Sequence, residues 1–146
     1  MAILAIGSDH TGYKLKREIY DYFTNRGYQV IDLGCDSPEY VDFPDYADKV
    51  AETVASDSEC LGVLICGTGI GMSIAANRRK GVRAALCHTE YEAQLSRDQH
   101  NANVLCIGAR TFERDAALRV VGRFLRSEYS DNRYEQCLQK VDRLAS

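Results

Sequence analysis

The stretch from Val63 to Asn77, VLICGTGIGMSIAAN, decides the fold of this chain. A short apolar run passes into glycines at positions 67, 69 and 71, and a segment of helical composition follows. Strand, glycine loop and helix in this order are typical of one unit of a parallel α/β sheet. Cys66 ends the apolar run, and the glycines after it let the backbone come close to a bound ligand.

Apolar runs of strand length recur along the chain, at 2–7, 28–34, 61–66, 82–87 and 103–108. Their continuous apolar character favours strands buried on both faces, as in a parallel sheet. Segments with helical periodicity lie between them, for example Leu15, Ile19 and Phe23, and a last helix is expected over about 131–144. The pattern predicts one domain, residues 1–146, with an open α/β sheet covered by helices on both faces.

The composition argues against several classes of protein. With a net charge of −3, the chain is not expected to bind nucleic acid or a membrane surface in general. No apolar run approaches the roughly 18 residues that cross a bilayer. The first residues, MAILAIGSDH, have neither a basic region nor a cleavage site, and we interpret them as a strand rather than a signal peptide. We therefore expect a cytoplasmic protein.

Cysteines are unusually frequent and occur at positions 35, 60, 66, 87, 106 and 137. No two of them form a CxxC pair, and the closest pair, Cys60 and Cys66, is separated by six positions. This spacing is unsuited to a zinc site, and nothing indicates a secreted disulfide scaffold. We expect most of the thiols to be small buried hydrophobic groups and the protein to hold no metal.

The glycine loop CGTGIG admits two interpretations. Its amides could bind an anion or a developing oxyanion, or the glycines could simply allow a tight turn between strand and helix. A dinucleotide fingerprint is disfavoured, because the spacing is GxGxG rather than GxGxxG and the loop follows the third strand. A P-loop is excluded because no GK[ST] follows. The glycines alone leave the anion site and the structural turn open.

Cys66 favours a chemical role for the loop. Amide donors beside a thiol stabilise its thiolate, which can act as a general base or as a nucleophile. A nucleophile would need a paired histidine and an acyl or disulfide substrate. A base would need an acidic C–H beside a carbonyl, whose enolate the loop amides would stabilise. The second interpretation uses both the thiol and the glycines.

Longer motifs identify a family. GSDHTGYKLK, YVDFPDYA, ICGTGIGMSIAAN, GVRAALCH and NVLCIGAR together resemble type B ribose-5-phosphate isomerases, a group that includes the galactose-6-phosphate isomerase subunits. The resemblance covers nearly the whole chain. It implies a Rossmann-like three-layer α/β/α sandwich with a five-stranded, mainly parallel sheet, and a step of the pentose phosphate pathway. It also implies a homodimer, possibly a tetramer, with sites at the subunit interface and no cofactor.

The resemblance also implies roles for individual residues. Cys66 is expected to move the proton between C1 and C2 of a sugar phosphate through a cis-enediol, with Thr68 assisting, and Asp9 to help open the furanose ring. Arg110 and Arg133 are expected to bind the phosphate, because a guanidinium suits its oxygens. The remaining expected substrate-binding residues are His10, Gly67, Gly69, Ile70, Gly71, Ser73 and Asn101. Without the resemblance, Asp9 and His10 would equally fit a helix cap.

The chain departs from the family pattern at three places. Where relatives have SRxHNDAN, this sequence has SRDQHNAN, so that Gln99 stands at the place of the ring-opening histidine. A shift of the loop by one residue would give that role to His100. Cys137 stands where a second phosphate-binding arginine is usual, and Phe43 where a tyrosine is common.

These departures keep two alternatives open. The chain could isomerise another sugar phosphate, such as galactose 6-phosphate, allose 6-phosphate or a tetrose phosphate. It could also bind a sugar phosphate without turning it over. Neutral glutamine cannot transfer a proton near pH 7 as histidine can, which is why the Gln99/His100 register decides between turnover and binding alone.

Overall fold

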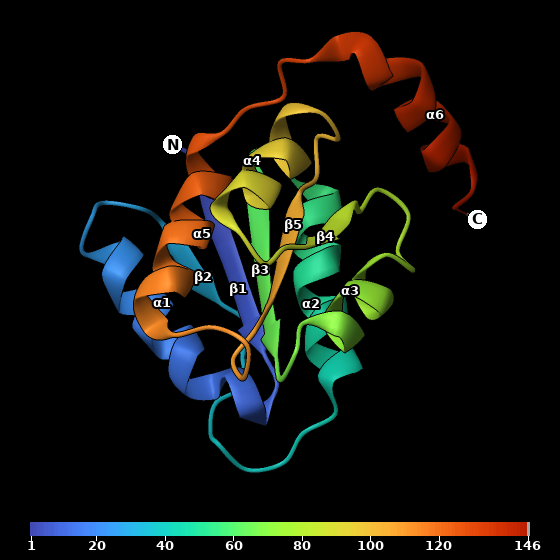
Figure 1. The fold of residues 1–146 in the computed structure, drawn as a ribbon. Coiled ribbons are helices and arrows are strands. Elements are labelled where there is room, and N and C mark those ends of the chain that lie inside the picture. Colours follow the sequence, from blue (N-terminus) through green and yellow to red (C-terminus); the bar gives the residue numbers. More distant parts are fainter. Residues whose placement is uncertain (146) are drawn as a thin grey trace.

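The computed structural model describes residues 1–145 and forms a five-stranded parallel sheet with helices on both faces (Figure 1). The strands are β1 (Ile3–Ser8), β2 (Val30–Asp32), β3 (Cys60–Cys66), β4 (Ala84–Leu86) and β5 (Val104–Gly108). Their order in the sheet is β2-β1-β3-β5-β4, and every neighbouring pair is parallel. The predicted α/β class with a five-stranded sheet is therefore confirmed.

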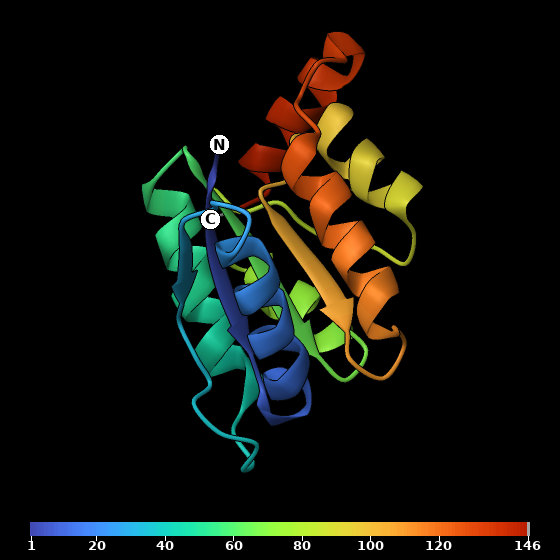
Figure 2. The ribbon, with the colours of Figure 1, turned by 90° about the vertical axis from the view of Figure 1, so that its left-hand side faces the viewer.

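The first four helices connect successive strands, and the last two follow β5. The helices are α1 (Tyr13–Thr24), α2 (Phe43–Ser56), α3 (Ile70–Ala76), α4 (Glu90–Asp98), α5 (Arg114–Arg126) and α6 (Glu135–Arg143), with short 3₁₀ turns η1 (His10–Gly12) and η2 (Asn132–Tyr134). Figure 2 shows α1 and α5 on one side of the sheet and α2 on the other. Within residues 1–145, none of these helices combines the length and the apolar character that a membrane crossing requires.

Successive side chains of each strand point to opposite faces of the sheet, which divides the core into two layers. On β1, Leu4 and Ile6 pack with α1 and α5, whereas Ala5 packs with α2. Successive side chains of a strand point to opposite faces, so a strand buried on both faces must be apolar throughout. This is why the continuous apolar runs predicted the strands.

Strand lengths differ from the sequence prediction at the sheet edges. The expected strand over 28–34 is reduced to Val30–Asp32 and that over 82–87 to Ala84–Leu86. Both are edge strands with a single neighbour, so fewer ladder hydrogen bonds hold their ends. The expected terminal helix is also shorter, because η2 precedes α6.

The parallel arrangement brings the ends of three strands together. Ser8 lies opposite Ile65, and Cys66 lies opposite Gly108 in the register of the sheet. The segments that follow β1, β3 and β5 therefore meet at the carboxyl edge of the sheet, where open α/β folds bind their ligands.

Candidate active site

A cavity of about 340 Å³ opens at this carboxyl edge. It is lined by the segments after β1, β3 and β5 and by the connection between β2 and α2. The lining residues are Asp9, His10, Thr11, Tyr40, Val41, Phe43, Cys66, Gly67, Thr68, Gly71 and Arg110. Its size suits a small molecule with a few polar groups.

Cys66 is the last residue of β3 and is 6% exposed. The backbone N–H of Gly69 donates a hydrogen bond to its sulfur, with nitrogen and sulfur 3.2 Å apart. Gly69 has a φ of +81°, and a β-carbon there would lie 2.7 Å from Leu86 Cδ1. Only glycine fits this position without strain, so the loop sequence itself places an amide against the thiol.

Asp9 follows β1 and is held by the turn that it caps. Its Oδ1 accepts hydrogen bonds from the backbone N–H of Thr11 at 3.0 Å and of Gly12 at 3.3 Å, and from the Thr11 hydroxyl at 2.5 Å. The carboxylate is therefore both a cap and a wall of the cavity. The two interpretations that the sequence left open for Asp9 are compatible.

His10 is oriented by the connection between β2 and α2. Its Nδ1 accepts a hydrogen bond from the backbone N–H of Val41 at 3.4 Å, and its ring lies 4.8 Å from the Tyr40 ring. A neutral imidazole that accepts at Nδ1 carries its proton at Nε2. His10 can thus offer an N–H to a ligand oxygen in the cavity.

Arg110 follows β5 and reaches across the glycine loop. Its backbone N–H donates to the Gly67 carbonyl at 2.9 Å, and a β-carbon on Gly67 would lie 3.2 Å from Arg110 Nη1. Gly67 thus leaves room for the guanidinium. Within residues 1–145 no carboxylate pairs with this arginine, so its charge is free for an anionic ligand.

The structure brings together most of the residues expected from the sequence. Seven of them line the cavity: Asp9, His10, Cys66, Gly67, Thr68, Gly71 and Arg110. Gly69 acts through its amide; Ile70 and Ser73 lie on the adjoining helix, where the Ser73 hydroxyl donates to the Ile70 carbonyl at 2.8 Å. Sequence reasoning missed Thr11, Tyr40 and Val41, although all three lie in segments that leave the carboxyl edge.

His100, Asn101 and Arg133 lie elsewhere. His100 and Asn101 precede β5, at the amino edge of the sheet, whereas Cys66 pairs with the last residue of that strand. The length of β5, about 13 Å from its first to its last residue, therefore lies between the two edges. Arg133 lies in η2 and pairs with Asp131, with Nη2 and Oδ2 2.6 Å apart. Within residues 1–145 of one copy, none of these three residues lines the Cys66 cavity.

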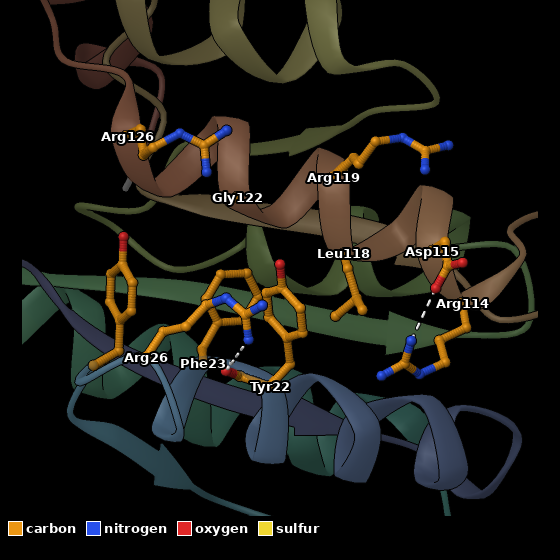
Figure 3. Close-up of a pocket in the computed structure, with 10 residues that line it drawn as sticks. Tyr22, Phe23, Arg26, Arg114, Asp115, Leu118, Arg119, Gly122 and Arg126 are labelled. Atoms are coloured by element: carbon orange, nitrogen blue, oxygen red, sulfur yellow. Dashed lines mark hydrogen bonds and ion pairs between the residues drawn. The ribbon is translucent and has the colours of Figure 1, made fainter.

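A larger cavity, of about 480 Å³, lies between α1 and α5 (Figure 3). It contains four arginines, but Arg114 pairs with Glu18 and Asp115, and Arg26 lies 3.5 Å from the Tyr22 ring centroid. Arg126 belongs to the last turn of α5, where cations offset the negative end of the helix dipole. We therefore place the chemistry at Cys66. Elsewhere in residues 1–145, no three His, Cys, Asp or Glu side chains gather as a possible metal site.

The geometry around Cys66 defines a class of enzyme. A thiol that accepts an amide hydrogen bond lies in one cavity with a carboxylate, a histidine N–H and a guanidinium that has no carboxylate partner within residues 1–145. These groups suit the transfer of a proton on a small anionic carbonyl compound, which is the chemistry of a sugar-phosphate isomerase.

Comparison with known proteins identifies the family. The sequence profile described as Ribose/Galactose Isomerase matches residues 4–141. Ribose-5-phosphate isomerase B of Escherichia coli (strain K12) is 43% identical over 141 residues, which cover 97% of this chain and 95% of the relative. The chain is therefore an isomerase and belongs to the ribose/galactose isomerase family.

Solved structures agree with the sequence comparison. Ribose-5-phosphate isomerase B of Clostridium thermocellum superimposes with a TM-score of 0.93 at 47% identity, covering 97% of this chain and 95% of that one. The Mycoplasma genitalium enzyme, solved with bound ribulose-5-phosphate, gives a TM-score of 0.93 at 39% identity, covering 97% and 94%.

Proposed function

We propose that the protein interconverts ribose 5-phosphate and ribulose 5-phosphate. The observation that carries this proposal is the Cys66 thiol, which accepts a hydrogen bond from the Gly69 amide at 3.2 Å inside a cavity that Arg110 also lines. Relatives named ribose-5-phosphate isomerase B, one of them solved with ribulose-5-phosphate bound, support this choice of substrate.

The proposed reaction uses the residues of the cavity in sequence. Asp9 assists the opening of the furanose ring. The Cys66 thiolate removes the proton from C2 of the open aldose, which leaves an enediolate with its charge on O1. A proton then moves from O2 to O1, and the thiol returns its proton to C1 as the O2 carbonyl of the ketose forms. Thr68 and the amides of the loop from Gly67 to Gly71 stabilise the charge that develops on the sugar oxygens. No cofactor takes part in this sequence.

Binding of the substrate is assigned to polar groups around the thiol. Arg110 binds the phosphate, since its guanidinium has no carboxylate partner within residues 1–145. His10 donates its Nε2–H to the sugar or its phosphate. Ile70 and Ser73 support the loop from the first turns of α3.

We further propose that the active unit is a homodimer in which a second copy completes each site. His100, Asn101 and Arg133 would then reach the Cys66 cavity of the neighbouring copy. Exposed apolar side chains lie on α3 beside the Cys66 loop, at Ile70 and Ile74, and on α6, at Val141. Apolar patches of this kind mark protein–protein contacts, which supports an interface that joins the two regions.

The exposure of the loop after α4 favours His100 over Gln99 as the group that acts on the neighbouring copy. Gln99 caps α4 and is half-buried, whereas His100 is exposed and its ring is stacked 6.0 Å from that of Tyr134. The exposed position of His100 thus supports a shift of the functional histidine by one residue, from position 99 to position 100.

Subunit complementation tests both proposals in one experiment. Cys66→Ala and His100→Ala are each expected to abolish or strongly reduce ribulose 5-phosphate formation. When the two variants are unfolded together and refolded, half of the dimers are mixed and each carries one complete site, so that about a quarter of the parent activity returns. Gln99→Ala is the matched control for the loop. Absence of any recovery, with each variant dimeric, would contradict the shared site.

A second candidate function is isomerisation of a different sugar phosphate. It is favoured by Phe43, which lines the cavity without a hydroxyl, and by Cys137, which is exposed on α6 where an arginine is expected. Rates with galactose 6-phosphate, allose 6-phosphate and erythrose 4-phosphate, measured beside ribose 5-phosphate, separate the two. Thermal stabilisation by these compounds without turnover would instead indicate a sugar-phosphate-binding protein.

We also propose that residues 1–146 act as a single isomerase domain in the cytoplasm. Both core layers pack on one sheet within the described residues, which supports one domain. All six cysteines are free thiols, which suits a reducing compartment.

A further inference from the structure

Arg83 connects two parts of the chain that are far from it in sequence. Its Nε and Nη2 donate to the two carboxylate oxygens of Asp142 in α6, at 3.1 and 2.7 Å. Its Nη1 donates to the carbonyls of His100 at 3.3 Å and Asn101 at 3.4 Å. A planar guanidinium fixes the relative orientation of groups that it bonds on two sides.

The segment around His100 depends on this arginine. The neighbouring Asn101 has a φ of +48°, and its side chain accepts a hydrogen bond from Arg97 Nη1 at 3.1 Å. Arg97 also binds the Ala102 carbonyl. Within residues 1–145, however, the His100 side chain is positioned by the Tyr134 ring and its carbonyl by Arg83.

The orientation of α6 depends on the same arginine. Leu138 is its one buried residue within the described chain. The segment before it is fixed where the backbone N–H groups of Ser130 and Asp131 donate to the Asp98 carbonyl. Beyond Leu138, the pair between Arg83 and Asp142 ties the helix to the sheet. A weakly buried helix would otherwise move relative to the loop.

We propose that Arg83 is a positioning residue that holds the His100 loop and α6 as one unit. The inference rests on the proposed function, in which the loop supplies His100 to the sugar ring of the neighbouring copy and η2, which leads directly into α6, supplies Arg133 to the phosphate. Arg83 touches neither substrate nor the reacting atoms. Its effect is to fix the spacing between two groups that must act on opposite ends of one ligand.

Two substitutions separate the links that Arg83 makes. Arg83→Met removes the bonds to both the loop and α6, and it is expected to lower kcat at least about tenfold and to raise KM. Asp142→Ala removes only the link to α6, so KM is expected to rise while kcat stays within about threefold of the parent. Arg79→Met, which breaks the exposed pair between Arg79 and Asp48, is the control and should leave both constants unchanged.

Hydrogen exchange measures the same coupling without substrate. In Arg83→Met, residues 99–103 and 135–143 are expected to exchange faster together, whereas in Asp142→Ala only the second segment accelerates. Arg83→Lys keeps the charge but has a single donor nitrogen, so it is expected to restore part of the protection. It replaces the methionine variant if that variant fails to fold. Parent-like exchange in both segments of a folded Arg83 variant overturns the proposal. If the parent and all variants lack isomerase activity, the proposed function is refuted. Hydrogen exchange still tests whether Arg83 couples the two segments.

Discussion

The backbone N–H of Gly69 donates a hydrogen bond to the sulfur of Cys66, and the two atoms are 3.2 Å apart. This hydrogen bond fixes the sulfur against the glycine loop, beside the cavity that holds Asp9, His10 and Arg110. Gly69 can supply it because its φ of +81° turns the loop back toward the end of β3. The conformation of one residue thus positions the side chain of another.

Gly69→Ala is expected to damage both activity and stability. Its β-carbon would lie 2.7 Å from Leu86 Cδ1 and 2.9 Å from the Ile107 carbonyl carbon, so the loop must move and its amide must leave the thiol. Gly81→Ala is the matched control, because Gly81 has a φ of +88° but its nearest neighbour would be 3.5 Å away. The control should lose about 1–2 kcal/mol of unfolding free energy and retain turnover. If the two substitutions lower turnover equally, the close contact at position 69 is not the cause of the lost activity.

Cys66→Ala is expected to reduce turnover by about 10² to 10⁴, the usual contribution of a positioned general base. The substitution removes one sulfur atom from a site that is already next to a cavity, so the fold should persist. Cys137→Ala, which changes an exposed thiol on α6, is the control. Initial rates with ribose 5-phosphate and circular dichroism spectra provide the measurement. Retention of most activity by the Cys66 variant would exclude the thiol as the base.

Thiol reactivity should differ sharply between Cys87 and Cys137. Burial, aided by the nearby charge of Glu92, raises the pKa of Cys87 to about 11. At pH 8 only about one Cys87 side chain in a thousand would be a thiolate, and the thiolate is the reactive form. Iodoacetamide followed by peptide mass spectrometry should therefore modify Cys137 and leave Cys87 intact in the native protein. Similar labelling rates at the two positions would contradict this prediction.

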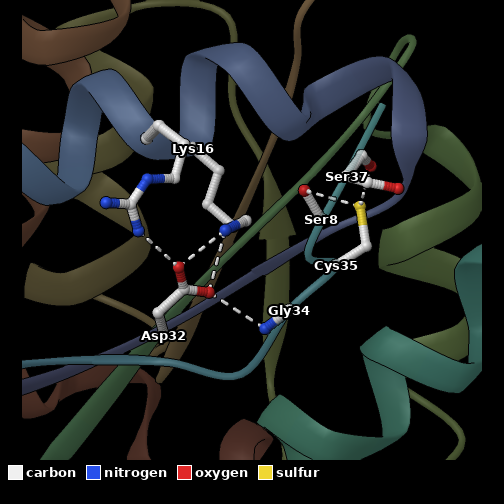
Figure 4. A network of polar contacts seen from close by, with 7 residues as sticks. Ser8, Lys16, Asp32, Gly34, Cys35 and Ser37 are labelled. Carbon is white, nitrogen blue, oxygen red and sulfur yellow. Dashed lines mark hydrogen bonds and ion pairs between the residues drawn. The ribbon is translucent and has the colours of Figure 1, made fainter. Parts of the chain in front are cut away.

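Asp32→Asn is expected to destabilise the protein in a pH-dependent manner. Asp32 accepts hydrogen bonds from Lys16, Arg17 and the Gly34 amide (Figure 4), and Lys16 is 1% exposed. Burial tends to raise the pKa of Asp32, but the hydrogen bonds and charge of Lys16, with Gly34 and Arg17, outweigh it, so that its pKa is lowered. A lowered pKa stabilises the fold above the unfolded value of about 3.9, and this contribution disappears as the pH falls through the folded value.

At pH 7 the substitution should therefore cost about 2–3 kcal/mol, because it leaves the buried Lys16 charge without its partner. The difference between variant and parent should begin to shrink below about pH 4, where the unfolded parent takes up a proton at Asp32, and should level off only below the lowered pKa of the folded protein. Urea unfolding at several pH values measures both effects. Asp48→Asn, in an exposed pair with Arg79, is the control and should behave as the parent does. A difference that stays constant down to pH 3 would contradict the linkage.

The sheet could be predicted from local sequence because its signal is local. The central strands β1, β3 and β5 are largely apolar runs of at most seven residues, and burial on both faces requires that pattern. The prediction was less accurate at β2, expected over 28–34 and found at Val30–Asp32, because the number of neighbouring strands fixes where an edge strand ends.

The sequence predicted those site residues that lie at or just after the carboxyl ends of strands. Cys66 is the last residue of one strand and Asp9 directly follows another, and parallel strands bring such positions to one edge. Tyr40 escaped prediction because it lies in a connection without periodicity, and only the packing of that connection against His10 places it in the cavity.

By itself, the sequence determined the α/β class, the glycine loop and the thiol at its start, because spacing along the chain encodes each of them. Tertiary structure alone decided that His100 lies at the opposite edge of the sheet from Cys66, and that Arg83 joins Asp142, 59 residues away. Such contacts depend on how strands are ordered and how helices pack. Those arrangements are set by the burial of the whole chain, and no short segment carries the information.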